Sequence, residues 1–290
     1  MRIQVVLLQN QSSCVADRIL IPDDPSAYVG SIPEQYDRNL GPLLFADYAV
    51  DISRRAAACR PRRVLEIAAG TGIVSRELRN LLPVGVELTV TDLNSPMLEI
   101  ARTKFRPEEL VKFHPADATA LPFPDNSFDV LVCQFGVMFF PDKDKSYRDA
   151  IRILVPGGRY IFSVWDSHRY NAFGRVAHEV AGRFYPADPP QFMTVPFGYR
   201  FEPIKDSLIG AGFADISAQV IRLEKRDADL TALARGQIYG SPLIDQIQQR
   251  GGFEAEQIVA ALVQAYRTEF GNDPATIPLQ AILFSARKPS

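Results

Sequence analysis

The sequence predicts an α/β protein built on a doubly wound, mostly parallel sheet. The main observation is an alternation between residues 62 and 164, where short apolar runs that favour strands are separated by helix-like segments. Strands connected in this way pair in parallel through right-handed crossovers. Helices are expected after Gly72, Ser95 and Asp142. Strands are expected at 64–68, 87–91, 111–114, 128–134 and 159–164.

The segments on either side of this alternation organise the rest of the chain. Residues 1–27 lack periodicity and predict an extended N-terminal arm, which leaves 28–290 as the main domain. Segment 166–202 is rich in aromatic residues, Pro and Gly and predicts an active-site cover, and 227–272 predicts a mainly helical insertion. These two segments form the predicted lid. Helices within 28–60 and near 203–211, and strands near 215–223 and 277–286, complete the predicted fold.

Composition and charge exclude several classes of protein. Hydrophobic residues make up 47% and charged residues 23% of the 290, as in ordinary globular domains. A net charge of −2 gives no overall positive field for phosphates, which argues against a nucleic-acid partner. The three cysteines match neither a zinc site nor a disulfide framework, so we expect no metal and a reduced, cytoplasmic protein. No apolar stretch approaches the roughly 20 residues of a membrane span, and nothing in the sequence indicates the oligomeric state.

The strongest motif is Glu66-Ile67-Ala68-Ala69-Gly70-Thr71-Gly72, where the first strand turns into a helix. Glycines at such a turn let the backbone approach a ligand that a Cβ would exclude. A dinucleotide-binding fingerprint would carry a third glycine where this chain has Ser75. An acid followed by Gly-x-Gly fits the cofactor turn of a methyltransferase better, and a purely structural tight turn is the third alternative.

Three further features end successive predicted strands. Asp92 lies 20 residues after Gly72, where a carboxylate accepts hydrogen bonds from ribose hydroxyls or, alternatively, caps the next helix. Asp117-Ala118 offers a carboxylate and a backbone N–H to the edge of adenine, or forms a simple turn. Gln134 offers a backbone carbonyl to an ammonium group, or is only a buried strand end. Together, and in this order, they favour an adenosyl ligand.

Segments 66–78, 92–101, 117–132 and 154–161 together resemble the class I S-adenosylmethionine-dependent methyltransferases. The group most similar to this chain includes quinone-biosynthesis and other small-molecule methyltransferases. The resemblance is specific over about 62–164 and looser over 203–223. It implies a Rossmann-like, seven-stranded sheet with the last strand antiparallel. It also implies S-adenosylmethionine as the cofactor, S-adenosylhomocysteine as the product, and a small molecule as the methyl acceptor.

The resemblance also implies individual roles for residues of the site. Ala68 stands where many members have glycine, a mild departure, and Tyr36 resembles an aromatic residue that caps the methionine end of the cofactor. Met97 and Phe135 complete the predicted cofactor-binding set. The implied contacts are Glu66 with the methionine amino group, Gly70 and Gly72 at the close turn, Asp92 with ribose, Leu93 with one adenine face, Asp117 and Ala118 with the adenine edge, and the Gln134 carbonyl with the ammonium.

The chemistry of methyl transfer leaves the need for a base open. A sulfonium already makes its methyl group electrophilic, so the protein mainly aligns the nucleophile and excludes water. The acceptor atom belongs to a phenol, a carboxylate, a carbon or an amine, and the aromatic lid predicts an apolar or aromatic molecule. His168 is the candidate catalytic base, with His178 as a second, although a structural role is the commoner one for such a histidine. A non-catalytic S-adenosylmethionine-binding protein and an NAD-dependent oxidoreductase are the rival hypotheses.

Overall fold

The computed structural model describes residues 24–272 and 274–290, and it contains a seven-stranded sheet in the order β3-β2-β1-β4-β5-β7-β6. All neighbouring strands pair in parallel except β7, which is antiparallel to β5 and β6. The predicted doubly wound sheet with an antiparallel last strand is therefore confirmed. Most of the predicted arm, residues 1–23, lies outside the described residues. The strands are β1 (Arg63–Glu66), β2 (Glu87–Asp92), β3 (Val111–Pro115), β4 (Phe128–Gln134), β5 (Leu154–Trp165), β6 (Ala214–Ala228) and β7 (Ala275–Arg287).

Two hydrophobic cores cover the two faces of the sheet. Side chains of a strand point alternately to opposite faces, and β4 shows this directly. Its Val130 and Val132 belong to the core packed by α2 and α3, whereas Leu131 and Cys133 belong to the core that contains α5 and α7. The covering helices are α2 (Ala46–Ala58), α3 (Ile73–Leu81), α4 (Ser95–Thr103), α5 (Lys143–Ile153) and α7 (Phe201–Gly210), with short turns of 3₁₀ helix at η2 (Pro107–Glu109) and η3 (Val137–Phe139).

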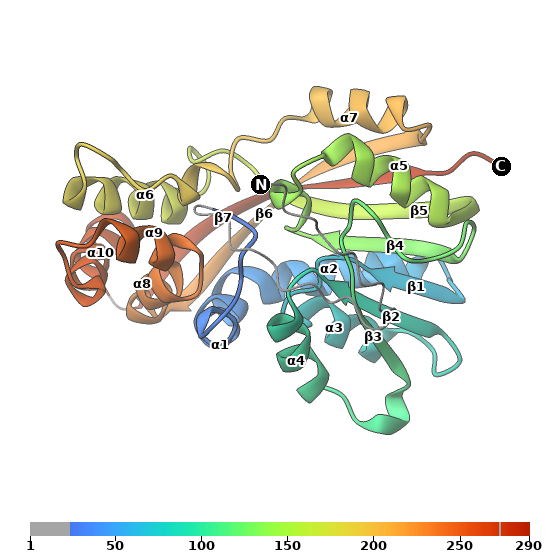
Figure 1. Cartoon of the computed structure of the whole chain (residues 1–290), viewed down its shortest axis with the longest axis horizontal. Helices are drawn as coiled ribbons and strands as arrows, with labels where there is room; N and C mark the ends of the chain where they lie inside the picture. Colours follow the sequence, from blue (N-terminus) through green and yellow to red (C-terminus); the bar gives the residue numbers. More distant parts are fainter. Residues whose placement is uncertain (1–23, 273) are drawn as a thin grey trace, which may run out of the picture.

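The segments outside the α/β core gather at one end of the sheet, the end to which β6 and β7 extend (Figure 1). Helix α6 and the 3₁₀ turn η4 follow β5, and three helices fill the connection between β6 and β7. The Tyr266 hydroxyl donates a 2.8 Å hydrogen bond to the Phe173 carbonyl, which ties the two insertions together. They comprise α6 (Ala172–Phe184), η4 (Phe192–Thr194), α8 (Leu230–Tyr239), α9 (Leu243–Arg250) and α10 (Ala255–Phe270).

The helix expected within 28–60 has an unexpected geometry. A short α1 (Ile32–Gln35) continues into a π-helix, η1 (Tyr36–Phe45), before α2 begins. Pro42 lies inside η1, and a proline removes a backbone donor and crowds the carbonyl four residues earlier, which opposes regular α-helical bonding. The spacing of apolar residues predicts that this segment is helical. It does not predict that part of the segment is a π-helix instead of an α-helix.

Candidate active site

One cavity lies at the carboxyl ends of β1, β2, β4 and β5, where ligands bind in doubly wound sheets. The cavity and its open mouth together enclose about 1110 Å³. Of the predicted cofactor-binding residues, Glu66 and Gly72 lie behind its wall. The others line it: Tyr36, Ala68, Gly70, Asp92, Leu93, Met97, Asp117, Ala118, Gln134 and Phe135.

The turn after β1, beside the cavity, contains three residues with left-handed backbone conformations. Ala68, Gly70 and Gly72 have φ angles of +51°, +56° and +78°. A Cβ on Gly72 would lie only 2.8 Å from the Cβ of Ala101, so Gly72 is required for packing against α4. Gly70 has open space where its Cβ would be, and it lines the cavity. The two glycines thus lie in different surroundings, Gly72 against α4 and Gly70 at the open cavity.

Asp92 holds this turn in place from the neighbouring strand. Its Oδ2 accepts a 2.8 Å hydrogen bond from the backbone N–H of Gly70, and its Oδ1 accepts one of 2.8 Å from the N–H of Asn94. The carboxyl group is buried, and burial raises its pKa while these N–H donors lower it. Asn94, not Asp92, occupies the N-cap position of α4. The Asp92 oxygens retain lone pairs on the cavity side that ligand hydroxyls can use.

Glu66 lies one layer behind the cavity wall. Its Oε2 accepts a 2.5 Å hydrogen bond from the Ser75 hydroxyl at the start of α3. The side chain is almost completely buried, and burial raises the pKa of this carboxyl to about 8 even though the Ser75 bond lowers it. Glu66 is therefore a protonated or readily protonated acid near neutral pH, in a position where a nearby cation would favour its ionised form.

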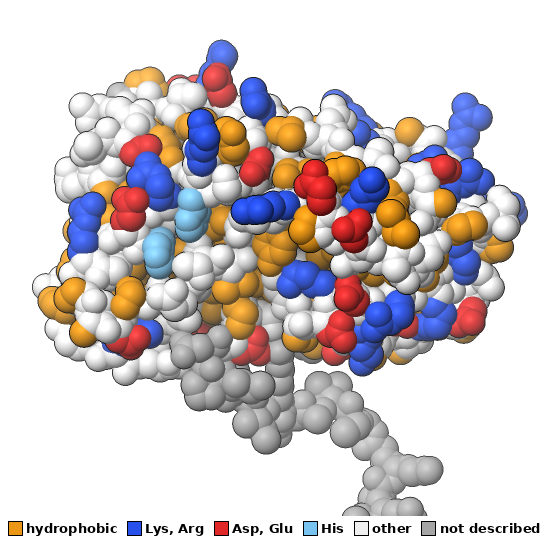
Figure 2. Space-filling view, turned by 90° about the horizontal axis from the view of Figure 1, so that it is seen from above, with side chains coloured by type: hydrophobic (Ala, Val, Ile, Leu, Met, Phe, Trp, Pro, Cys, Tyr) orange, Lys and Arg blue, Asp and Glu red, His pale blue; other side chains and the backbone are white. Residues whose placement is uncertain are grey.

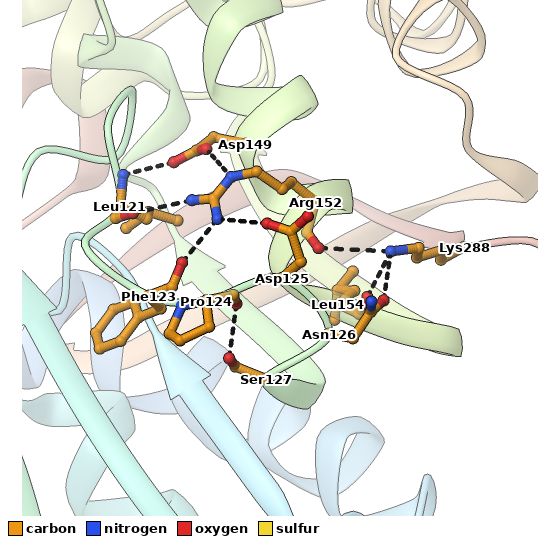
Figure 3. A network of polar contacts seen from close by, with 10 residues as sticks. All are labelled: Leu121, Phe123, Pro124, Asp125, Asn126, Ser127, Asp149, Arg152, Leu154 and Lys288. Atoms are coloured by element: carbon orange, nitrogen blue, oxygen red, sulfur yellow. Dashed lines mark hydrogen bonds and ion pairs between the residues drawn. The ribbon is translucent and has the colours of Figure 1, made fainter.

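The loop after β3 carries Asp117 and is fixed by a polar network. Asp117 Oδ1 accepts from the backbone N–H and the hydroxyl of Thr119, at 2.7 and 2.9 Å. Further along, Arg152 of α5 donates to the carbonyls of Leu121 and Phe123 at 2.9 and 2.7 Å (Figure 3). Arg152 also bonds Asp149, whose other oxygen accepts from the Leu121 N–H. The guanidinium thereby fixes the shape of the loop that supplies one wall of the cavity.

At the end of β4, Gln134 lines the cavity and has one buried, unpaired polar atom. Its Nε2 donates to the Phe45 carbonyl at 3.2 Å, whereas its Oε1 is buried and has no hydrogen-bond partner among the described residues. An unpaired buried acceptor is costly. The next residue, Phe135, has a φ of +54° and stacks on Trp165 with ring centroids 4.1 Å apart.

The far side of the cavity is apolar and comes from segments distant in sequence. Phe173 and Phe197 of segment 166–202 belong to it, as do Gln237 and Ser241 of segment 227–272. Neither of the last two could be predicted from the sequence, because only tertiary packing decides which face of an inserted helix meets the site. Other lining residues outside the predicted site set are Ser26, Tyr28, Leu40, Leu44, Phe45, Asn94, Ala116, Gly136, Met138, Phe139, Phe140, Pro141, Phe192, Met193 and Pro196. An aromatic cluster such as Tyr28 with Tyr36 is not visible in a motif.

His168 lies outside the cavity wall. Its Nε2 is 2.8 Å from the carbonyl oxygen of Met193, and its ring centroid is 4.5 Å from that of Phe197. Because a carbonyl only accepts, this geometry puts the proton of a neutral ring on Nε2. Burial lowers the pKa of His168. The histidine contacts two residues of the wall, Met193 and Phe197, from behind.

Other candidate functions find no support among the described residues. No group of His, Cys, Asp or Glu within 24–272 and 274–290 has the arrangement of a metal site. In the same ranges, no helix is long and apolar enough to cross a membrane. Basic and acidic side chains are interspersed over the face seen in Figure 2, without a basic stripe of the kind that tracks a nucleic-acid backbone. Cys59 and Cys133 are free thiols.

The sheet, the glycine turn and the carboxylates together define an α/β protein with a ligand site at the strand ends, and sequence comparisons identify its family. Residues 65–162 match the model of a methyltransferase domain. The chain is 39% identical over 139 residues to demethylmenaquinone methyltransferase of Thermus thermophilus, a match covering 48% of this chain and 61% of the relative. It is 31% identical over 172 residues to a ubiquinone/menaquinone biosynthesis C-methyltransferase of Serratia proteamaculans, covering 54% of this chain and 68% of the relative.

The fold is shared with solved structures of low sequence identity. The YcgJ protein of Bacillus subtilis aligns with a TM-score of 0.57 at 20% identity, over 84% of this chain and 99% of its own. Phosphoethanolamine N-methyltransferase 2 of Haemonchus contortus, solved with S-adenosyl-L-methionine, aligns with a TM-score of 0.59 at 19% identity, over 92% of this chain and 59% of its own. This chain belongs to the class I S-adenosylmethionine-dependent methyltransferases.

Proposed function

We propose that the chain transfers the methyl group of S-adenosylmethionine to a small apolar or aromatic molecule. The observation that carries this proposal is the mixed lining of one cavity, which we divide into a polar half at the strand ends and an aromatic half. One half presents Asp92, Asp117 and the Gly70 turn, and the other presents Trp165 and Phe197. A cofactor with polar groups suits the first half, and a flat apolar acceptor suits the second.

Under this proposal the residues at the strand ends hold the cofactor. Asp92 accepts from the ribose hydroxyls, Asp117 and Ala118 meet the adenine edge, and Leu93 and Met97 cover the adenine ring. Gln134 lines the cavity at the end of β4, where the resemblance puts its backbone carbonyl against the ammonium group. Tyr36 covers the methionine end, where π-helix η1 presents it to the cavity. S-adenosylmethionine, when bound, supplies a methyl group on a positively charged sulfur.

The acceptor is proposed to react by direct in-line transfer. A lone pair or electron-rich carbon of the acceptor forms the new bond to methyl, the carbon–sulfur bond breaks with its electrons left on sulfur, and the acceptor loses a proton to solvent. Among the described lining residues, the titratable groups are Tyr28, Tyr36, Asp92 and Asp117. Burial raises the pKa of both tyrosines, so they stay neutral at pH 7. The chain then promotes the reaction mainly by aligning the acceptor with the methyl group and by excluding water.

Segments 166–202 and 227–272 are proposed to form the lid that selects the acceptor. Support comes from the residues that each places on the wall, aromatic ones from the first segment and Gln237 and Ser241 from the second, together with the attachment of the first segment to the sheet end. Asn171, which is fully buried, donates to the carbonyls of Asp166 and Gln280 and accepts from the Gln280 N–H, so the first segment is fixed to β7. The names of the two curated relatives support a quinone-like acceptor. A location in the cytoplasm is part of the same proposal.

The proposal is tested by cofactor binding followed by turnover. We expect S-adenosylmethionine and S-adenosylhomocysteine to bind in calorimetry and NAD not to bind. Asp92→Ala should abolish the binding signal of both adenosyl ligands. The substitution removes the carboxylate that accepts from the ribose hydroxyls and the hydrogen bond that holds the Gly70 N–H. Transfer of a labelled methyl group to a panel of aromatic acceptors then separates an enzyme from a binding protein. Binding of NAD without a response to either adenosyl ligand would overturn the proposal.

A further inference from the structure

The side-chain amide of Gln237 belongs to the part of the cavity wall that comes from the insertion between β6 and β7. Gln237 lies on α8, is 3% exposed, and belongs to the cavity wall. Besides the backbone hydrogen bonds of α8, its carbonyl accepts from the Ser241 hydroxyl at 2.7 Å. The side-chain amide makes no hydrogen bond within the described part of the chain. Its polar atoms are not among the fully buried side-chain atoms that lack a partner, so they are accessible from the cavity. A ligand that covered this amide without bonding it would leave the group unpaired, which costs free energy.

Close helix packing fixes the position of this amide. Gly236 lies so near η1 that a Cβ there would come within 2.5 Å of Leu40 Cδ2, and a Cβ on Gly240 would lie 2.9 Å from the backbone N of Tyr36. The two glycines therefore let α8 lie directly against the π-helix. Ser241 then anchors the next turn, because its hydroxyl accepts from the Leu243 N–H at 3.3 Å. Gln237 is thus held in place before any acceptor binds, which lowers the entropic cost of recognition.

We propose that Gln237 determines acceptor specificity by hydrogen-bonding one oxygen substituent of an otherwise apolar, flat acceptor. This inference rests on the proposed function, because it concerns the acceptor half of the same cavity. The cofactor half has its own polar groups at the strand ends, whereas Gln237 comes from the insertion between β6 and β7. A neutral amide both donates and accepts, so it recognises a hydroxyl or a carbonyl without adding charge to the aromatic wall.

Two probes of matched shape test this role in the full chain. With the cofactor site filled by S-adenosylhomocysteine, binding of 2-naphthol and 2-methylnaphthalene is measured by their own fluorescence. We expect the wild-type protein to prefer the hydroxyl compound by about two- to tenfold, the value of one net hydrogen bond. Gln237→Leu should remove this preference and retain the affinity for 2-methylnaphthalene. Gln237→Met, whose side chain is closer in shape to glutamine, should behave in the same way. It replaces Gln237→Leu in the test if that variant folds poorly.

The matched control is Gln248→Leu, the same substitution at an exposed position of the neighbouring helix α9, outside the cavity wall. It should keep the preference of the wild-type protein. A preference that survives in both Gln237 variants, or that is absent from the wild-type protein, overturns the assignment to Gln237 while the methyltransferase proposal stands. If S-adenosylhomocysteine itself does not bind, the proposed function fails. If it binds and neither probe does, the apolar acceptor and the role of Gln237 are both wrong.

Discussion

Ala68 and Gly136 are in contact where β1 and β4 end, and each limits the size of the side chain that the other position can hold. Ala68 adopts a left-handed φ of +51°, and a Cβ added to Gly136 would overlap the Cβ of Ala68. It would also lie 2.8 Å from the Sγ of Cys133. The left-handed alanine is therefore accommodated by a glycine on the neighbouring strand end.

The first prediction is that Ala68→Gly stabilises the protein. A non-glycine residue in the left-handed region costs roughly 1–2 kcal/mol, while the added freedom of glycine in the unfolded chain removes about 0.4–1 kcal/mol of that gain. We expect a net increase of about 0.5–1 kcal/mol in the free energy of unfolding, measured by urea denaturation. Gly136→Ala should be destabilising in the native background and less so in Ala68→Gly. Strictly additive effects of the two substitutions would contradict the contact between them.

A second prediction concerns the pH dependence caused by Glu66. Because its pKa is about 8 in the folded protein and near 4.5 when unfolded, the folded state keeps a proton that the unfolded state has lost between these values. Stability without ligand should therefore fall as the pH rises through this window. Glu66→Gln mimics the protonated acid, so its stability relative to the wild-type protein should rise by about 1–3 kcal/mol between pH 5.5 and 7.5.

Cofactor binding offers a second readout for the same carboxyl group. The bound cation should stabilise the ionised form of Glu66 and release a proton near pH 7. Calorimetry in buffers of different ionisation enthalpy measures this release, and Glu66→Gln should abolish it. Burial also raises the pKa of Asp92, so part of the pH dependence of the free energy of unfolding will persist in Glu66→Gln. If the wild-type protein and Glu66→Gln show the same pH dependence of the free energy of unfolding and the same proton release, Glu66 does not titrate in this range.

The cofactor half of the site was predictable because its residues follow strand ends in chain order. Parallel strands bring their carboxyl ends to one edge, so Gly70, Asp92 and Gln134 could be expected to converge from sequence spacing alone. The sequence put Glu66 at the end of the first strand, and only the structure shows that its side chain bonds Ser75 behind the wall. The aromatic half could not be resolved in this way. Gln237 reaches the cavity because Gly236 fits against Leu40, a contact between segments about 200 residues apart that leaves no local pattern.

A third prediction tests the network around Arg152. Arg152→Met removes the donors to the carbonyls of Leu121 and Phe123 and the partner of Asp149. We expect the free energy of unfolding to fall by about 1–3 kcal/mol. Affinity for S-adenosylhomocysteine should also fall, since the loop continues from Asp117. Arg148→Met is the matched control, on the same helix and exposed. A loss of stability without any loss of affinity would limit Arg152 to a structural role.

The last prediction concerns His168, which the sequence suggested as a base and which the structure places behind the wall. Its Nε2 donates to the Met193 carbonyl, so we expect it to position that segment of the lid. The side-chain amide of glutamine can make a similar bond, and His168→Gln should keep turnover within a few-fold of the wild-type rate, with any acceptor that the wild-type protein methylates. His168→Ala should raise KM for the acceptor more than it lowers kcat. Loss of a general base typically costs about 10²–10⁴ in rate, so a fall of that size in both variants, with unchanged cofactor affinity, would show that His168 takes the proton.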